Sequence, residues 1–236
     1  MRVLAGTSGW SFKEWKGSFY PKDLPHDEEL SYYAGRFSAV EINNTFYRMP
    51  RESVLLDWAS KVPPSFRFAI KASQRITHHG RLKDVQDSVE YLTRILSVLE
   101  ERRGPTLFQL PPNLRKDVPR LADFLEVLPR RWASAFEFRH ESWFDDRVYE
   151  ILREKNAALC IADHDDFQTP VLSTATWAYA RLHRLAYDEA ALGEWSERLT
   201  GLGADELYVF FKHDETAGSG PSAALAFSRT LAARAA

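Results

Sequence analysis

The sequence predicts a single α/β domain folded as a (β/α)8 TIM-like barrel, and three observations support this fold class. Eight short apolar segments recur along the 236 residues, separated mostly by amphipathic or turn-rich stretches. Strands that alternate with helices pair in parallel through crossover connections, and eight of them can close into a barrel. The length is close to the roughly 250 residues typical of such barrels. Because no internal repeat or linker divides the chain, we expect one domain over residues 1–236.

The expected strands are short runs rich in apolar, β-branched or aromatic residues. In chain order they are Val3–Ser8, Ala39–Asn44, Arg67–Ser73, Thr106–Leu110, Ser134–His140, Ala158–Asp163, Trp177–His183 and Leu207–His213. An open, doubly wound sheet produces similar local patterns and is the alternative architecture.

Segments with helical spacing lie between most of these strands. The clearest is Asp84–Arg103, whose large apolar residues recur at intervals of three and four. Asp117–Leu128 begins with an aspartate suited to cap a helix. Weaker helices are expected at Arg51–Val62, Asp145–Lys155, Ala190–Leu202 and Ser222–Ala235.

Two connections depart from the regular alternation. The stretch His164–Thr176 is too short and too rich in Pro and Thr for a full helix, so the barrel should be irregular between its sixth and seventh strands. In the first crossover, Trp10–Phe37, a long loop rich in aromatic residues precedes any segment with a helical pattern.

The composition limits the classes of function. Hydrophobic residues make up 44% of the chain and charged residues 27%, an ordinary globular balance. The net charge of −2 supplies no overall positive field that would attract nucleic acid or an anionic membrane. Cys160, the only cysteine, excludes an internal disulfide and a thiolate zinc site and is expected in the core. With no signal-peptide pattern and no apolar run of the ~20 residues that cross a bilayer, the chain is expected to be cytoplasmic and free of membrane contact.

Polar residues fall on one alternate face of almost every expected strand. In the second strand, for example, Val40 and Ile42 oppose Glu41 and Asn43. The polar positions of the later strands include Lys71, Gln109, Glu137, Arg139, Asp163, Arg181 and Lys212. In a barrel such positions converge at the mouth, where active sites form. Burying an unpaired charge costs on the order of several kcal/mol, so these charges should pair with each other or bind a ligand.

The carboxylates suggest acid–base chemistry. Glu137 lies on one face with Arg139, as a general acid or base beside an anion-binding Arg or as half of a structural ion pair. A second carboxylate from Glu41 suits glycoside hydrolysis or a divalent metal, depending on the separation. A metal bound through Glu41, Glu137, Asp163 and His183 is therefore an open alternative, and no redox cofactor is expected.

Cationic and aromatic residues suggest the ligand. Lys71, Arg181 and Lys212 form a positive arc suited to phosphate or carboxylate, unless they only balance internal carboxylates. Aromatic residues crowd the expected mouth loops and can stack on sugars or bases or form a small loop core; they are Trp10, Trp15, Phe19, Tyr20, Phe46, Tyr47 and Trp143. His140 is expected to form hydrogen bonds at the rim.

Several of these segments are also family motifs. They are Gly6-Thr7-Ser8-Gly9-Trp10, the run VEINNTFY at 40–47, FQLPP at 108–112, FEFRH at 136–140 and YARLH at 179–183. With these motifs the chain resembles the YecE-like family (domain of unknown function family 72) over nearly its whole length. The resemblance implies a TIM-like barrel and no established reaction. One departure is Lys212-His213-Asp214, where family members commonly carry Asn-Asn-Asp.

The leading interpretation is an enzyme of hydrolase or lyase type that acts on a small anionic sugar-, phosphate- or nucleotide-like substrate. The residues expected to act catalytically are Glu41, Glu137 and Asp163. The residues expected to bind the substrate are Trp10, Asn43, Tyr47, Lys71, Gln109, Arg139, His140, Trp143, Arg181 and Lys212. A nucleic-acid-binding or repair-associated protein, not favoured by the net charge, and a non-catalytic ligand sensor are the alternatives. No pattern in the sequence specifies an oligomeric state.

Overall fold

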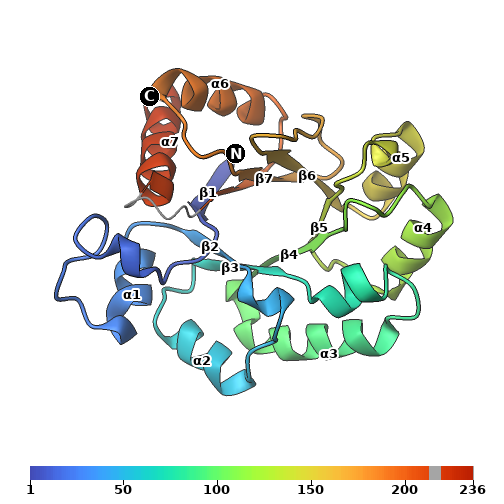
Figure 1. The fold of residues 1–236 in the computed structure, drawn as a ribbon, viewed down its shortest axis with the longest axis horizontal. Helices are drawn as coiled ribbons and strands as arrows, with labels where there is room; N and C mark the ends of the chain where they lie inside the picture. Colours follow the sequence, from blue (N-terminus) through green and yellow to red (C-terminus); the bar gives the residue numbers. More distant parts are fainter. Residues whose placement is uncertain (213–218, 236) are drawn as a thin grey trace.

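The structure, a computed structural model, describes residues 1–212 and 219–235 and has eight parallel strands at its centre. The strands are β1 (Arg2–Thr7), β2 (Ala39–Ile42), β3 (Arg67–Lys71), β4 (Arg103–Gln109), β5 (Ser134–Glu137), β6 (Ala158–Asp163), β7 (Trp177–Leu182) and β8 (Glu206–Phe211). Hydrogen-bonded neighbours follow the order β1-β8-β7-β6-β5-β4-β3-β2, and β1 meets β2 at a parallel bridge between Ser8 and Glu41. The sheet is rolled into a nearly closed barrel with helices around it (Figure 1), so the predicted TIM-like barrel is confirmed and the open sheet is wrong.

The helices surround the barrel in the expected alternation. They are α1 (Glu29–Ala34), α2 (Glu52–Ser60), α3 (Gln86–Leu96), α4 (Val118–Val127), α5 (Asp146–Glu154), α6 (Glu189–Thr200) and α7 (Ser219–Ala235). Asp117 caps α4 as predicted, since its side chain accepts a hydrogen bond from the Arg120 amide. No α-helix lies between β6 and β7, which confirms the predicted irregularity there.

The helix expected over Asp84–Arg103 is shorter than predicted. It ends at Leu96 and passes into a 3₁₀ segment, Ser97–Arg102, in which Glu100 has a φ of 49°. A residue with positive φ cannot continue a right-handed α-helix. Its last expected residue, Arg103, instead begins β4.

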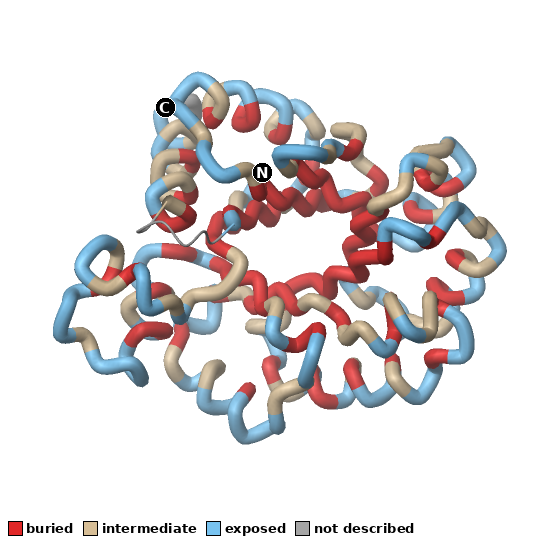
Figure 2. Tube along the Cα trace, in the orientation of Figure 1, coloured by how far each residue is buried: buried red, intermediate tan, exposed pale blue. Residues whose placement is uncertain are grey.

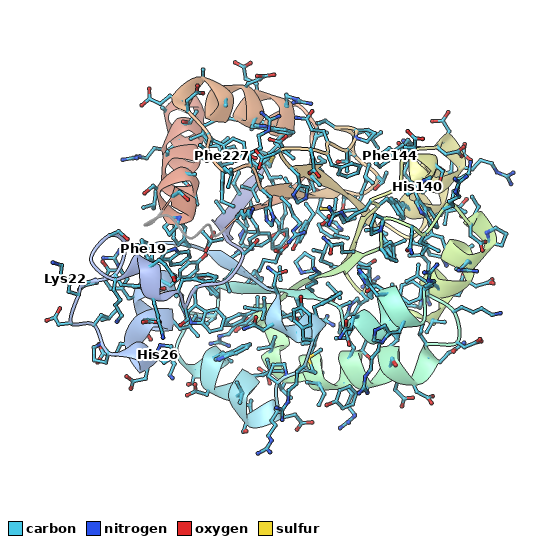
Figure 3. The ribbon with its side chains drawn as sticks, in the orientation of Figure 1. Phe19, Lys22, His26, His140, Phe144 and Phe227 are labelled. Atoms are coloured by element: carbon cyan, nitrogen blue, oxygen red, sulfur yellow. The ribbon has the colours of Figure 1, made fainter. Side chains whose placement is uncertain are left out.

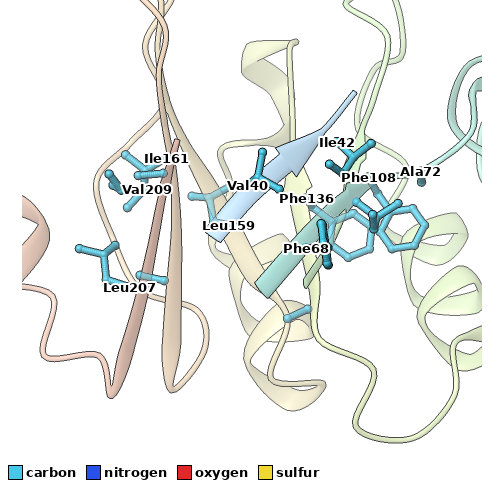
Figure 4. Packing of buried hydrophobic residues seen from close by; sticks show 14 of the residues in the cluster. Val40, Ile42, Phe68, Ala72, Phe108, Phe136, Leu159, Ile161, Leu207 and Val209 are labelled. Carbon is cyan, nitrogen blue, oxygen red and sulfur yellow. The ribbon is translucent and has the colours of Figure 1, made fainter. Parts of the chain in front are cut away.

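Every strand contributes to two apolar clusters, one inside the barrel and one between the strands and the helices. The inner cluster consists of Leu4, Ala39, Ala69, Leu107, Ala135, Ala158, Cys160, Trp177, Tyr179, Tyr208 and Phe210, so the expected burial of Cys160 is confirmed. Its alanines come from β2, β3, β5 and β6, and large rings from β7 and β8 fill the space that they leave. The outer cluster takes the intervening residues of the same strands, such as Val40, Phe136 and Val209 (Figure 4). Figure 2 accordingly shows the strands as a buried ring inside helices that alternate between buried and exposed segments.

The barrel closes at a seam between β1 and β2 that depends on a tyrosine hydroxyl. The Tyr33 hydroxyl accepts a hydrogen bond from the Thr7 amide at 2.8 Å and donates one to the Ala39 carbonyl at 3.1 Å. Gly6 permits this close approach, because a Cβ atom at that position would lie 1.9 Å from the Ala39 oxygen. The seam therefore needs both the absence of a side chain at residue 6 and the hydroxyl at residue 33.

The aromatic first loop forms a small core of its own. Trp15 and Tyr20 are buried, and Phe19 lies between them and the rings of Tyr32, Tyr33 and Phe37. Of the two roles considered for these aromatic residues, stacking on a ligand or forming a loop core, the structure favours the loop core.

No helix within the described residues is long and apolar enough to span a membrane.

Candidate functional site

The centre of the barrel mouth is an ionic cluster around Arg181, which β7 places on the inner face. Its Nη1 donates to Oε2 of Glu137 at 2.6 Å, and its Nη2 donates to Oε1 of Glu41 at 3.0 Å. Its Nε lies 3.0 Å from Oε2 of Glu41. Both carboxylates are fully buried and the arginine is 4% exposed. One guanidinium thus holds two carboxylates. Of the two interpretations of Glu137 and Arg139, the structural ion pair is wrong, because Glu137 pairs with Arg181 instead.

Three further side chains hold Glu41. Ser8 donates to Oε1 at 2.7 Å, Asn43 donates to the same oxygen at 3.0 Å, and the Tyr179 hydroxyl donates to Oε2 at 2.7 Å. Burial alone would raise the pKa of this carboxyl, but the charge of Arg181 and the hydrogen bonds from Ser8 and Tyr179 outweigh it and hold the pKa below its usual value. Glu41 is therefore ionised at neutral pH.

Glu137 is held in a similar way by Gln109, at the end of β4, and by His164, the residue that follows β6. Gln109 donates to its Oε1 at 2.8 Å, and His164 Nε2 lies 3.7 Å from the same oxygen. Burial opposes ionisation here too, but Arg181, His164 and Gln109 keep the pKa of Glu137 far below its usual range. A general acid needs a raised pKa, so neither glutamate is set up as the proton donor of a glycosidase.

A serine–histidine pair lies beside the ionic cluster. Ser8 Oγ is 2.9 Å from Nε2 of His183, and the ring of His183 lies edge-on to that of His164, with 5.3 Å between centroids. Burial and the charge of Arg181 lower the pKa of His183 well below its usual value, so the imidazole is neutral.

Ser8, His164 and Tyr179 are absent from the residues that the sequence predicts to act on or bind a ligand, and His183 enters there only as a possible metal ligand. Alternation places all four side chains on the inner face of the barrel. Tyr179 and His183 share the inward parity of Arg181, and His164 follows Cys160 and Ala162 on the same face of β6.

The same parity corrects the prediction for Asp163. It follows Leu159 and Ile161, which belong to the outer cluster, so it faces away from the barrel axis. Arg184 Nη2 lies 2.8 Å from its Oδ1, and the Tyr187 hydroxyl donates to its Oδ2 at 2.9 Å. The acidic residues considered for a metal are therefore divided between Arg181 and Arg184. Among the described residues, no three His, Cys, Asp or Glu side chains are grouped as metal ligands.

The cations of the rim have fewer partners than Arg181. Among residues 1–212 and 219–235, the structure gives Arg139 no ion pair and no side-chain hydrogen bond, and the same holds for the exposed Lys212. Lys71 Nζ lies over the Phe46 ring, 4.4 Å from its centroid. Burial and the charge of Arg181 lower the pKa of Lys71 to about 8. Positive charge is thus available at the rim, although the buried cluster beneath it is paired.

A pocket of 520 Å³ adjoins the cluster, and we call it the mouth pocket. Its lining includes Ser8, Trp10, Asn43, Trp58, His183 and Lys212. Trp10 and Trp58 pack edge to face at 4.9 Å between centroids. The Oδ1 atom of Asn43 is buried and has no hydrogen-bond partner among the described residues, so it remains available as an acceptor.

Three residues expected to bind substrate lie outside both the ionic cluster and the mouth pocket. Trp143 is fully buried, stacks on Phe138 and donates to the Leu114 carbonyl, so the prediction that it contacts a ligand is wrong. His140 accepts a hydrogen bond from the Ser142 amide, as a rim histidine was expected to do, and lies toward α5 (Figure 3). Tyr47 is 74% exposed and lines a separate groove between α2 and α3.

Comparisons with known proteins agree with the motifs. The family model described as "Protein of unknown function DUF72" matches residues 4–236. The UPF0759 protein YecE of Escherichia coli is 37% identical over 117 residues, which are 49% of this chain and 43% of YecE. The UPF0759 protein YunF of Bacillus subtilis is 27% identical over 164 residues, 63% of this chain and 54% of YunF. The matched region thus spans about half the length of these curated relatives.

Solved structures show the same architecture. A DUF72 family protein from Thermotoga maritima superposes with a TM-score of 0.88 at 30% identity, covering 98% of this chain and all of that one. One from Enterococcus faecalis gives a TM-score of 0.83 at 18% identity, covering 98% of this chain and 95% of the other, a likeness of fold alone. Of the departing run Lys212-His213-Asp214, the last two residues lie outside the described part. The family model covers nearly the whole chain, which therefore belongs to the DUF72 family of proteins of unknown function.

Proposed function

We propose that the barrel mouth is the active site of an enzyme of hydrolase or lyase type whose substrate is a small molecule carrying a carboxylate or phosphate group. The observation that carries this proposal is the charge of the rim. Glu41 and Glu137 are both taken up by Arg181, whereas Arg139 and Lys212 have no anionic partner among the described residues. Cations at the rim that have no partner, above buried carboxylates that are already bound by Arg181, favour an anionic ligand.

The buried cluster supports the site without acting as its acid. Its two carboxylates and one guanidinium carry a net charge of −1 beneath the rim cations. This negative charge partly offsets the repulsion between Lys71 and Arg139. Hydrogen bonds from Ser8, Gln109 and Tyr179 fix the carboxylates in place. The mouth pocket, with its indole rings and the free acceptor of Asn43, offers room for the uncharged part of a substrate.

A thermal-shift titration tests the proposal. Malate, inorganic phosphate and sugar phosphates are added to the protein and to Arg139→Ala, with Arg153→Ala, an exposed arginine of α5, as the matched control. A ligand at about 100 times its Kd adds roughly 2.7 kcal/mol, or about 5–10 °C in a chain of this size. We expect a rise in the native protein and Arg153→Ala that Arg139→Ala lacks. Equal responses in all three proteins, or none, would contradict an anion site at the mouth.

A second candidate, nucleic-acid binding, has one observation in its favour. A groove of 880 Å³ adjoins the mouth pocket at Arg48 and Pro50, and its lining includes Arg51, Arg75 and the exposed rings of Tyr47 and Tyr91. Arginine and tyrosine together suit a single strand, since bases stack on rings and phosphates pair with guanidinium groups. Binding of a short labelled oligonucleotide that weakens steeply with salt and is lost in Arg51→Ala/Arg75→Ala would support this function over the first.

A further inference from the structure

Lys71 stands at the point where β3 opens into the mouth. Ala69, two residues earlier, belongs to the inner cluster, so the lysine side chain starts on the inner face. The backbone there is fixed, because Thr45 Oγ1 lies within hydrogen-bond distance of two carbonyl oxygens, that of Lys71 at 2.7 Å and that of Ile42 at 2.9 Å. The ends of β2 and β3 are thereby tied together, and the lysine is presented from a rigid base.

The ammonium group has an aromatic neighbour and no anionic one. Its Nζ lies 4.4 Å from the centroid of the Phe46 ring, and within the described residues the structure gives it neither an ion pair nor a hydrogen bond. Burial, Arg181 and Arg139 disfavour the charged amine, while Glu137 and Glu41, already paired with Arg181, favour it. The balance leaves the pKa at about 8, so a substantial share of the amine is neutral near neutral pH.

A histidine lies on the same ring. His78, in the π-helical turn Arg75–His79, is edge-on to Phe46 with 4.8 Å between ring centroids. Its Nδ1 is 2.9 Å from Thr77 Oγ1, which orients the imidazole. Burial and the charge of Lys71 lower the pKa of His78, with smaller contributions in the same direction from His79, Arg139 and Arg81. A neutral imidazole therefore contacts the same aromatic ring as the lysine amine.

From this arrangement we propose that Lys71 is a nucleophile that forms an imine with the aldehyde or ketone group of a small anionic substrate, with His78 transferring the protons. The proposal rests on the proposed function and narrows its substrate class to carbonyl compounds that also bear a carboxylate or phosphate. Arg139 pairs with that anion. An unpaired, partly buried amine beside other cations is the environment in which lysine acts as a nucleophile.

The step balances without a further reactant. The neutral amine adds to the carbonyl carbon, and one amine proton passes through His78 to the former carbonyl oxygen, giving a carbinolamine. The second amine proton leaves with the hydroxyl group as water, and a C=N bond replaces the C=O bond. The imine then withdraws electrons from the adjacent carbon, which is the activation that bond cleavage of lyase type requires.

Reductive trapping tests the proposal. The protein is incubated with glyoxylate, and separately with glycolaldehyde phosphate, sodium borohydride is added, and the modified lysines are identified by peptide mass spectrometry. Because the pKa of Lys71 is about 8 and that of an ordinary lysine is 10.5, Lys71 has roughly two orders of magnitude more neutral amine than an exposed lysine at pH 7.5. We expect Lys71 to carry at least tenfold more adduct than the exposed Lys83, which lies on the same β3–α3 connection.

Matched variants separate the outcomes. Lys71→Arg should abolish the adduct, Lys83→Arg should leave it unchanged, and His78→Asn should slow its formation about tenfold while the final amount is retained. Circular dichroism checks that each variant is folded. Even labelling of exposed lysines, or an unchanged adduct in Lys71→Arg, overturns the imine. If phosphate and malate still give an Arg139-dependent thermal shift while trapping fails, the imine alone is overturned, and failure of both experiments overturns the proposed function as well.

Discussion

At the scale of single residues, the mouth depends on the balance of charge around Arg181. Two buried carboxylates share this guanidinium, so each glutamate is tolerated inside the barrel only because the arginine and several hydrogen-bond donors compensate it. Lys71 and Arg139, by contrast, stand where solvent or a ligand can reach them. The buried charges are thus paired and hydrogen-bonded, whereas the charges without a partner lie at the rim, where water can solvate them.

We predict that Arg181→Met destabilises the fold by about 3–5 kcal/mol, because it leaves two buried carboxylates without a cation. Urea denaturation at pH 7 measures the loss, with Arg153→Met on α5 as the control for a change of the same kind at the surface. Part of the loss should return in the triple variant that also carries Glu41→Gln and Glu137→Gln. A loss below about 1 kcal/mol would mean that the two glutamates are compensated by other groups.

The stability should also fall as the pH is lowered below about 6.5. The pKa of His183 is lowered in the folded state, so below the ordinary histidine pKa the unfolded chain takes up a proton that the folded chain does not. One such group contributes a slope of up to about 1.4 kcal/mol per pH unit. Urea denaturation between pH 5 and 8 should show this slope. In His183→Gln the slope should be smaller, by the amount that the uptake of one proton contributes. An unchanged slope would assign it to another group, such as His78.

Residue roles could be predicted only in part from the sequence. Alternation correctly indicated that Glu41, Glu137, Lys71 and Arg181 share the inner face, because two-residue periodicity is a local property of a strand. It could not show which cation pairs with which carboxylate, because strands far apart in sequence supply the partners. The error at Asp163 has a different origin, since Asp163 is a polar residue at the end of β6 but shares the outward parity of Leu159 and Ile161, whereas Cys160 faces the barrel axis.

At the scale of elements, polar strand ends explain most differences from the expected boundaries. Every strand except β6 ends earlier than expected, and after β2 and β5 the chain leaves the ladder to present side chains such as Asn43 and Arg139. Hydrophobic pattern identifies a strand but does not reveal the last hydrogen bond of its ladder. The helix after Asp84 differs for another reason, because the backbone of Glu100 takes a conformation that apolar periodicity cannot reveal.

The seam gives a prediction at this scale. Tyr33→Phe removes the hydroxyl that serves the Thr7 amide and the Ala39 carbonyl, both buried, and should cost about 1–3 kcal/mol. Tyr32→Phe, on the same helix, is the matched control, because no hydrogen bond of its hydroxyl contributes to the seam. Thermal unfolding compares the two variants. Equal melting temperatures would show that the strand bridge between Ser8 and Glu41 closes the barrel by itself.

At the scale of the whole molecule, inner and outer clusters share every strand. Neither can be lost while the other remains intact, because the same backbone supports both. Barrel closure was predictable from the number and alternation of the strands. The composition of the interior, with alanines on one side and aromatic rings on the other, was not predictable, because it depends on which strands face each other across the axis.

This arrangement predicts one cooperative unfolding transition, the behaviour expected of the single domain over residues 1–236. Tryptophan fluorescence reports on both clusters, through Trp177 inside and Trp143 outside, whereas far-ultraviolet circular dichroism reports on the helices. The two signals should change at the same urea concentration. Separate midpoints would indicate that part of the barrel unfolds independently.

The seam at Tyr33 also links the integrity of the barrel to its mouth. Thr7, whose amide bonds this tyrosine, directly precedes Ser8, which bonds both Glu41 and His183. Any opening of the cylinder along this line must therefore disturb the mouth as well. In hydrogen–deuterium exchange, the Thr7 amide should accordingly report occupancy of a pocket that it does not line, exchanging more slowly once a ligand is bound.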